Sequence, residues 1–497
     1  MSEGTVPRGH PARRLTFLSF FALSLERLLA LVLVAVVAAL FGATKQSSTY
    51  FLALIVPITL GVSTSEAFYT ALLPLFTRAT RPPRELLYAA LRVAAPVTLA
   101  ATALYIVVLV AVSPAQLSVW LAFSPVIAAT GLNGVYAAFL TADRRYPLAI
   151  MRVPLATGIA LAFVAAVLPA RRSTTTLALG VSLGQLVTLA LLAWRARDAP
   201  KGSGAGKISA IGLLASAAAV FAATLVGGQL VIVVERFLAS GLVAGAVALL
   251  AFARGVALLP AMFAQALGSG IFPAATERFK ALERASLARL ALTGLRLSIL
   301  AGLVSTAFVV ICRQELVQIA FQRHAFGSAD TRETATLVAI LAASLAGVSA
   351  AATGSKTLFA LGRRGLVLAI SAASVGLYVV AAVVLREVYG LDGLATAFTV
   401  ASSVGGLIFA AALVPALGLR PTQIVREWIL APVLLAASFA GGALALWLPL
   451  GGEHPSVAAA LGTAVAVALG GLAALAVATR LANGLEYSLL RRDYFRR

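Results

Sequence analysis

Long apolar runs follow one another along almost all of this 497-residue chain, separated by short polar gaps. A helix that crosses a bilayer needs about 20 mainly apolar residues, and the runs supply about fourteen such segments. Apolar residues make up 61% of the chain and charged residues 11%, whereas an ordinary soluble domain carries roughly 25% charged residues. Disorder, a secreted disulfide-rich fold and a large soluble enzyme are therefore excluded. We predict an all-α polytopic membrane protein with about fourteen transmembrane helices.

Cationic residues gather in alternate polar gaps, which indicates how the helices are oriented. Arg13, Arg14, Arg78, Arg81 and Arg145 fall on one side of the membrane if the chain crosses at every apolar run. Cytoplasmic loops of membrane proteins carry an excess of lysine and arginine. We therefore predict an even number of spans with both termini in the cytoplasm. The net charge of +21 follows from this topology, so no nucleic-acid partner is expected.

The longest polar gap divides the apolar runs into six before it and eight after it. Its glycines and Pro200 predict a flexible cytoplasmic linker over 198–209. The expected architecture is two six-helix lobes followed by two C-terminal helices. The divisions are a cytoplasmic N-terminal tail at 1–16, an N-lobe at 17–197, a C-lobe at 210–418, two further spans at 419–482 and a basic C-terminal tail at 483–497.

The residues that usually perform catalysis are scarce. The three histidines, His10, His324 and His454, lie in tails or loops, and Cys312 is the single cysteine. There is no HExxH sequence, no P-loop and no acidic metal-binding cluster. We therefore expect no catalytic residue, no metal site and no cofactor, and a transporter rather than an enzyme.

Ionisable residues inside apolar runs are expensive in lipid and indicate a functional site. Arg254 lies in the middle of its run and cannot reach the interface easily, whereas Arg152 and Lys356 lie close enough to span ends to snorkel. Guanidinium groups bind phosphate with a planar fork. The predicted residues that bind an anionic substrate are Arg27, Arg254, Lys356 and Arg236, and the predicted charge-pairing or cation-coupling residues are Glu26 and Glu66.

Proline and glycine interrupt two of the runs at comparable places. Pro57 and Gly61 lie in the second span of the N-lobe, and Pro260 lies in the second span of the C-lobe. Broken helices line cavities in transporters, where freed backbone groups meet water or substrate. We predict hinges at these three residues, and the alternative is a simple kink at a helix contact.

Five stretches in sequence order resemble the MurJ/MviN-type lipid II flippases of the multidrug/oligosaccharidyl-lipid/polysaccharide exporter superfamily. The stretches are Phe41-Gly42-Ala43 through Val56-Pro57 to Leu73-Pro74; Ala138 to Ala149; Phe237 to Gly245 with Phe252-Ala253-Arg254 and Leu259-Pro260; Phe321 to Phe326 with Asp330-Thr331; and Leu358 to Gly362. Arg27 falls at an arginine position of the family. Arg254 and Glu66 each lie one position from a charged position of the family, at Gly255 and Ser65 respectively.

The resemblance implies a flippase in the bacterial cytoplasmic (inner) membrane that works by alternating access. Its cargo would be a polyprenyl-pyrophosphate-linked saccharide, a lipid II-like precursor of peptidoglycan. A Na⁺ or H⁺ ion or the membrane potential would drive it, and membrane lipids and enzymes of cell-wall or polysaccharide synthesis are candidate partners. Three alternatives stay open: a flippase for another lipid-linked oligosaccharide of capsule or exopolysaccharide, an ion-coupled multidrug exporter, and a membrane scaffold that does not transport.

Overall fold

A computed structural model of the chain describes residues 10–77, 82, 84–112, 114, 116–167, 172–200, 209–262, 284–418, 429–451, 454 and 456–481. Every regular element among these residues is a helix. The predicted C-terminal tail at 483–497 lies outside the described residues, as do residues 1–9 of the N-terminal tail and 201–208 of the linker.

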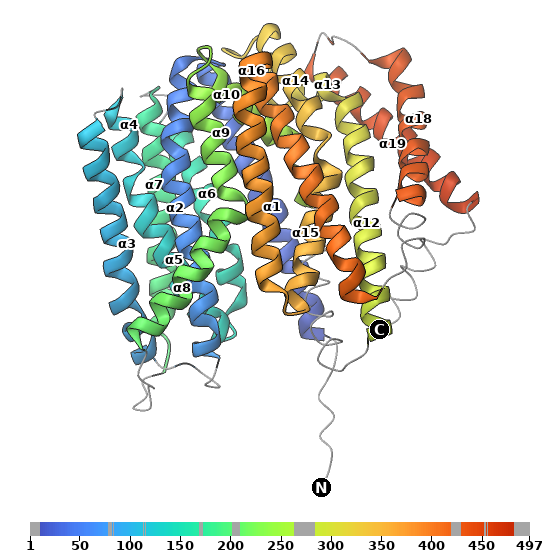
Figure 1. Cartoon of the computed structure of the whole chain (residues 1–497). Coiled ribbons are helices and arrows are strands. Elements are labelled where there is room, and N and C mark those ends of the chain that lie inside the picture. The colour runs from blue at the N-terminus through green and yellow to red at the C-terminus, as the bar shows by residue number, and fades with distance from the viewer. Residues whose placement is uncertain are drawn as a thin grey trace. The chain divides into compact units, whose positions relative to one another are not determined.

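The helices follow the apolar runs of the sequence (Figure 1). In chain order they are α1 (His10–Phe41), α2 (Lys45–Phe76), α3 (Arg84–Val112), α4 (Leu117–Ala122), α5 (Ser124–Ala142), α6 (Tyr146–Val167), α7 (Thr174–Ala196), α8 (Ala210–Thr224), η1 (Leu225–Gln229), α9 (Leu230–Ser240), α10 (Ala246–Ala257), α12 (Arg284–Ile311), α13 (Arg313–Phe321), α14 (Ser328–Ala342), α15 (Leu345–Ala360), α16 (Arg364–Leu417), α18 (Ala431–Leu450) and α19 (Val457–Leu481).

Eleven of the described helices are long and apolar enough to cross a membrane, or twelve if the bent pair α14 and α15 counts as one span. The 54-residue α16 would be about 80 Å long if straight, which is more than two membrane thicknesses. A left-handed backbone at Gly390 (φ 56°) interrupts it, so α16 supplies two spans. The shorter α10 ends in turns around Pro260. These helices fit the expected count of about fourteen, and the predicted all-α polytopic membrane fold is confirmed.

Packing groups the chain into two compact units. The N-terminal unit comprises Phe21–Ala251, and the C-terminal unit comprises Phe252–Arg497 together with Met1–Phe20. In the N-terminal unit, α2 packs against α5, α8 and α9, while α5 also packs against α3 and α7. The six-span lobes expected from the sequence are a different division, and these units do not test it.

Small residues let the helices of the N-terminal unit approach closely. A Cβ added at Gly134 in α5 would lie 2.2 Å from the carbonyl oxygen of Ser65 in α2. One turn further along α2, Phe68, Leu72 and Phe76 begin a buried cluster that includes Phe139 of α5. Glycine at a helix crossing is typical of packing in lipid, where van der Waals contact replaces the hydrophobic effect between helices.

In the C-terminal unit, α12 packs against α15 and α18, and α15 packs along α16. The backbones of α15 and α16 meet at Gly347 and Gly406, because a Cβ at Gly406 would lie 2.4 Å from the carbonyl oxygen of Gly347. The last two helices dock onto α12 and α13 through a buried cluster that includes Cys312 and Phe439. The indole Nε1 of Trp447 in α18 also donates to Glu315 of α13 at 2.9 Å. This bond satisfies part of a carboxylate that is almost fully buried.

Candidate functional site

Charged side chains of α1, α2 and α6 meet inside the N-terminal unit. The guanidinium of Arg152 in α6 donates to the carboxylate of Glu66 in α2 at 3.1 Å. Arg152 also donates to the Ala149 carbonyl at 3.1 Å and lies 5.4 Å over the ring of Tyr69. Glu26 of α1 interacts electrostatically with Arg27, Arg152 and Glu66. The structure thus places Glu26 within electrostatic range of Arg27 and of the Arg152–Glu66 ion pair.

Local packing orients this group of charges. Glu66 directly follows Ser65, the residue whose backbone touches Gly134 of α5, so the close crossing of α2 and α5 fixes the part of α2 that carries the carboxylate. Arg152 lies near the start of α6. The sequence analysis expected the Arg152 side chain to snorkel to the membrane interface, because the pattern of one helix does not reveal a carboxylate on another. Arg27 is exposed and Glu26 is half-buried in the described structure.

Arg236 of α9 is buried rather than open. Its guanidinium donates to the backbone carbonyl of Val247 at the start of α10 and lies 5.7 Å over the ring of Phe51 in α2. Nearby, the hydroxyl of Ser48 accepts a hydrogen bond from the backbone N–H of Ala248 at 3.2 Å. These contacts hold the turn between α9 and α10 against the start of α2. Substrate binding by Arg236 stays a prediction.

Arg254 lies on α10, in the C-terminal unit, and is half-buried. Its guanidinium carbon lies 4.1 Å above the ring centroid of Phe398 in α16. Two residues earlier, Phe252 packs against Phe321 and Phe326, with ring centroids 5.4 Å from each. The N–H groups of a guanidinium bind phosphate or carboxylate. No sequence pattern of α10 indicates Phe398, which is 144 positions away.

The other predicted site residues lie on two helices and in the turn that follows a third. Lys356 is half-buried on α15. Pro57 lies inside α2, which continues on both sides of it. Gly61 lies at a close contact with α5, where an added Cβ would be 3.0 Å from the Thr130 Cβ. Pro260 follows the end of α10. The hinge roles of these residues remain predictions.

The glycine pair at η1 is a hinge candidate that the sequence analysis did not select. The π-helical segment Leu225–Gln229 joins α8 to α9, and Gly228 departs from helical geometry with φ 159° and ψ −24°. No atom lies within 4 Å of a Cβ added at Gly227 or Gly228. In the sequence, the feature that could have indicated this hinge is the dipeptide Gly227-Gly228 within an apolar run.

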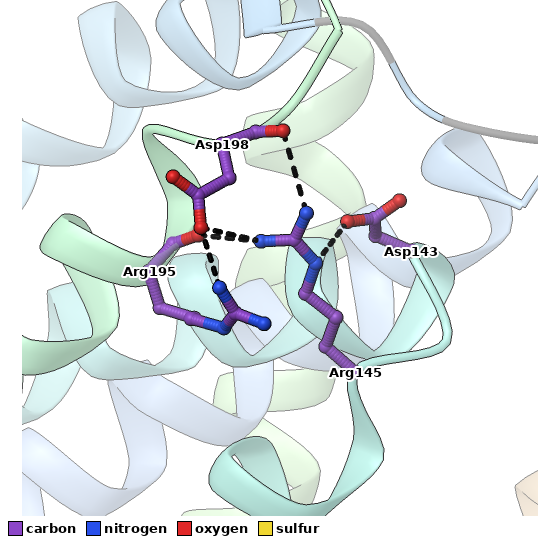
Figure 2. Close-up of polar contacts among 4 residues, drawn as sticks. All are labelled: Asp143, Arg145, Arg195 and Asp198. Atoms are coloured by element: carbon purple, nitrogen blue, oxygen red, sulfur yellow. Dashed lines mark hydrogen bonds and ion pairs between the residues drawn. The ribbon is translucent and has the colours of Figure 1, made fainter.

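A polar network joins the turn between α5 and α6 to the end of α7 (Figure 2). Arg145, in the turn between α5 and α6, forms ion pairs with Asp143 at 2.7 Å and with Asp198 at 3.6 Å. It also donates to the carbonyl of Arg195 at 2.7 Å, and Arg195 in turn pairs with Asp198 at 2.5 Å. The arginines that the sequence reading treated only as topology signals therefore also tie the α5–α6 turn to the end of α7.

Within the part of the chain that the structure describes, no group of three or more histidine, cysteine, aspartate or glutamate side chains is placed to hold a metal ion. The coupling cation expected from the sequence stays a prediction.

The fold is that of polytopic membrane transporters. It resembles the structure of a lipid II flippase MurJ in an inward closed conformation with a TM-score of 0.77 at 15% identity, over 94% of this chain and 99% of that chain. A multidrug resistance MATE family transporter of the MOP superfamily, in an outward-facing conformation, matches with a TM-score of 0.58 at 14% identity over 82% of this chain and 96% of that one. The Vibrio cholerae MATE transporter VcmN in the bent form matches with a TM-score of 0.56 at 15% identity over 83% and 97%.

The sequence defines the family more narrowly than the fold does. A family model described as lipid II flippase MurJ matches residues 37–450. The chain belongs to the lipid II flippase MurJ family, and it is a multi-pass membrane transporter. No curated protein sequence matches it.

Proposed function

We propose that this protein moves a polyprenyl-pyrophosphate-linked saccharide, such as lipid II, across the bacterial cytoplasmic membrane by alternating access. The observation that carries the proposal is the Arg254 guanidinium, which lies in the last turn of the short apolar helix α10 and rests on the ring of Phe398. A pyrophosphate offers such a group a bidentate partner. Membership of the MurJ family supports the cargo class.

Arg254 and Arg27 bind the pyrophosphate in this proposal, and Lys356 and Arg236 assist. Glu26 and Glu66 balance the arginines near them or bind a coupling cation, Na⁺ or H⁺. The membrane potential is an alternative driving force, since moving one charge across 100 mV is worth about 2.3 kcal/mol. Both termini lie in the cytoplasm, and enzymes of cell-wall or polysaccharide synthesis are candidate partners.

The excess of cations separates this proposal from export of cationic drugs. Together with Arg152, the residues predicted to bind substrate comprise five cations: Arg27, Arg152, Arg236, Arg254 and Lys356. The two predicted pairing carboxylates, Glu26 and Glu66, already lie near arginines. A cationic drug needs an acidic site, because like charges repel. Drug-efflux assays with the same preparations address this alternative.

Replacement of Arg254 tests the proposal. Arg254→Ala should weaken lipid II binding by about 30-fold or more, because loss of one partner of a charged pair costs about 2 kcal/mol or more. Arg254→Lys keeps the charge but loses the planar fork, and should recover only part of the binding. The measurements are lipid II binding in detergent micelles and flipping of labelled lipid II in proteoliposomes.

Arg313→Ala is the matched control. Arg313 is exposed and its guanidinium donates to the Val310 carbonyl, one turn away on α12, so its removal should leave binding and flipping unchanged. Wild-type flipping by Arg254→Ala would refute the assignment of the site. A separate comparison, growth of a strain depleted of its own lipid II flippase and supplied with this protein, distinguishes lipid II from another lipid-linked oligosaccharide as the cargo.

A further inference from the structure

We infer that Phe398 is a positioning residue of the proposed transporter: its ring holds the Arg254 guanidinium in the orientation that receives the anionic head group of the cargo. This inference rests on the proposed function. It assigns a role to a neutral residue on α16, whereas the expected site consisted of charged residues only.

The first step is the contact itself. The guanidinium carbon of Arg254 lies 4.1 Å above the Phe398 ring centroid, well inside the distance of about 6 Å at which a cation is attracted by the negative face of a ring. The contact restricts where the guanidinium lies, and a guanidinium binds phosphate through its N–H groups.

The second step is the rigidity of the helix that carries the ring. Thr399, next to Phe398, donates its hydroxyl to the Ile340 carbonyl of α14 at 2.7 Å. One to two turns further on, Ser402 and Gly406 meet the backbone of α15 at Gly347, at distances that leave no space for a side chain at either glycine. The ring of Phe398 therefore sits on a segment that two neighbouring helices fix in place.

The third step is the anchoring of Arg254 at its other end. Phe252, two residues before it, is fully buried and lies in a triangle of rings with Phe321 and Phe326. The backbone of α10 is thus fixed on one side of Arg254, and the Arg254 guanidinium is held by the ring of Phe398. A long flexible side chain held at both ends loses little conformational freedom on binding, which favours affinity.

The test measures binding of lipid II in detergent micelles and the initial rate of flipping as a function of lipid II content in proteoliposomes. Phe398→Leu should weaken binding about fivefold to tenfold, the range expected for loss of one partly exposed cation–π contact. The half-saturating lipid II content should rise by the same factor, while the maximal rate changes less. Phe398→Tyr and Phe398→Trp keep a ring and should retain binding close to that of the wild type.

Two further variants separate positioning from packing. Replacement of Phe398 by trifluorophenylalanine keeps the size but weakens the negative face of the ring, and should reduce binding. Phe409→Leu is the matched control, because Phe409 is a buried ring on the same helix that contacts Gly354 instead of Arg254. It should lower thermal stability at least as much and leave lipid II affinity unchanged.

The outcomes also separate this inference from the proposed function. Loss of binding in Arg254→Ala with wild-type binding in Phe398→Leu overturns the positioning role and leaves the function standing. Wild-type binding and flipping in Arg254→Ala refute the site assignment, on which this inference rests. Equal effects of Phe398→Leu and Phe409→Leu on affinity also overturn the positioning role, since they reflect packing alone.

Discussion

Replacing Gly134 with alanine should destabilise the N-terminal unit far more than the same change at an open glycine. The added Cβ would lie 2.2 Å from the Ser65 carbonyl oxygen and 2.7 Å from its Cα, whereas ordinary contact begins at 3.4 Å, so α2 and α5 must separate by about 1.2 Å. Both obstructing atoms belong to a helix backbone and cannot rotate away. Overpacking of this kind costs about 1–3 kcal/mol, and we expect the upper end of that range.

The matched control is Gly376→Ala in α16, where no atom lies within 4 Å of the new Cβ. There the replacement removes the flexibility of glycine from a helix and should stabilise by about 0.5–1 kcal/mol. The assay is thermal unfolding of the purified protein in one detergent. We expect the midpoint of Gly134→Ala to fall by about 5 °C or more, and that of Gly376→Ala to stay level or rise. Equal midpoints for the two variants would refute the close contact of α2 with α5.

Two other expectations concern single groups. Arg152→Met should leave the Glu66 carboxylate without its ion-pair partner at 3.1 Å and lower the unfolding midpoint. The Arg152→Met and Glu66→Gln double variant should recover most of the loss, because removing both charges costs less than stranding one. Additive losses in the double-mutant cycle of these two substitutions would contradict this pairing. Burial, with a smaller contribution from Glu315, raises the pKa of the Cys312 thiol to about 12, so about one molecule in ten thousand carries a thiolate at pH 8. Maleimide should therefore fail to label this single cysteine at pH 8 in the folded protein and label it fully in sodium dodecyl sulfate; rapid labelling of the folded protein would show that Cys312 is accessible.

Hydrophobic runs predicted the spans because a helix in lipid satisfies its own backbone and needs only length and apolarity. A helix as long as α16 exceeds one membrane thickness, and the break at Gly390 divides it into two spans. The hydrophobic runs did not reveal that Arg236 is buried against the Val247 carbonyl, or that Arg145 bridges Asp143 and Asp198. Those partners belong to other helices or turns, and only the packed structure brings them together.

The arginines inside the spans show why the sequence located charges better than it located their roles. Arg152, Arg236 and Arg254 each lie over an aromatic ring from another helix, at 5.4, 5.7 and 4.1 Å respectively. An aromatic face attracts a cation without adding a charge of its own, so it stabilises a guanidinium in the membrane. A carboxylate cancels that charge, as Glu66 does for Arg152, and a carbonyl occupies the fork, as Val247 does for Arg236. The ring contact is shortest at Arg254, the residue to which the proposed function assigns anion binding.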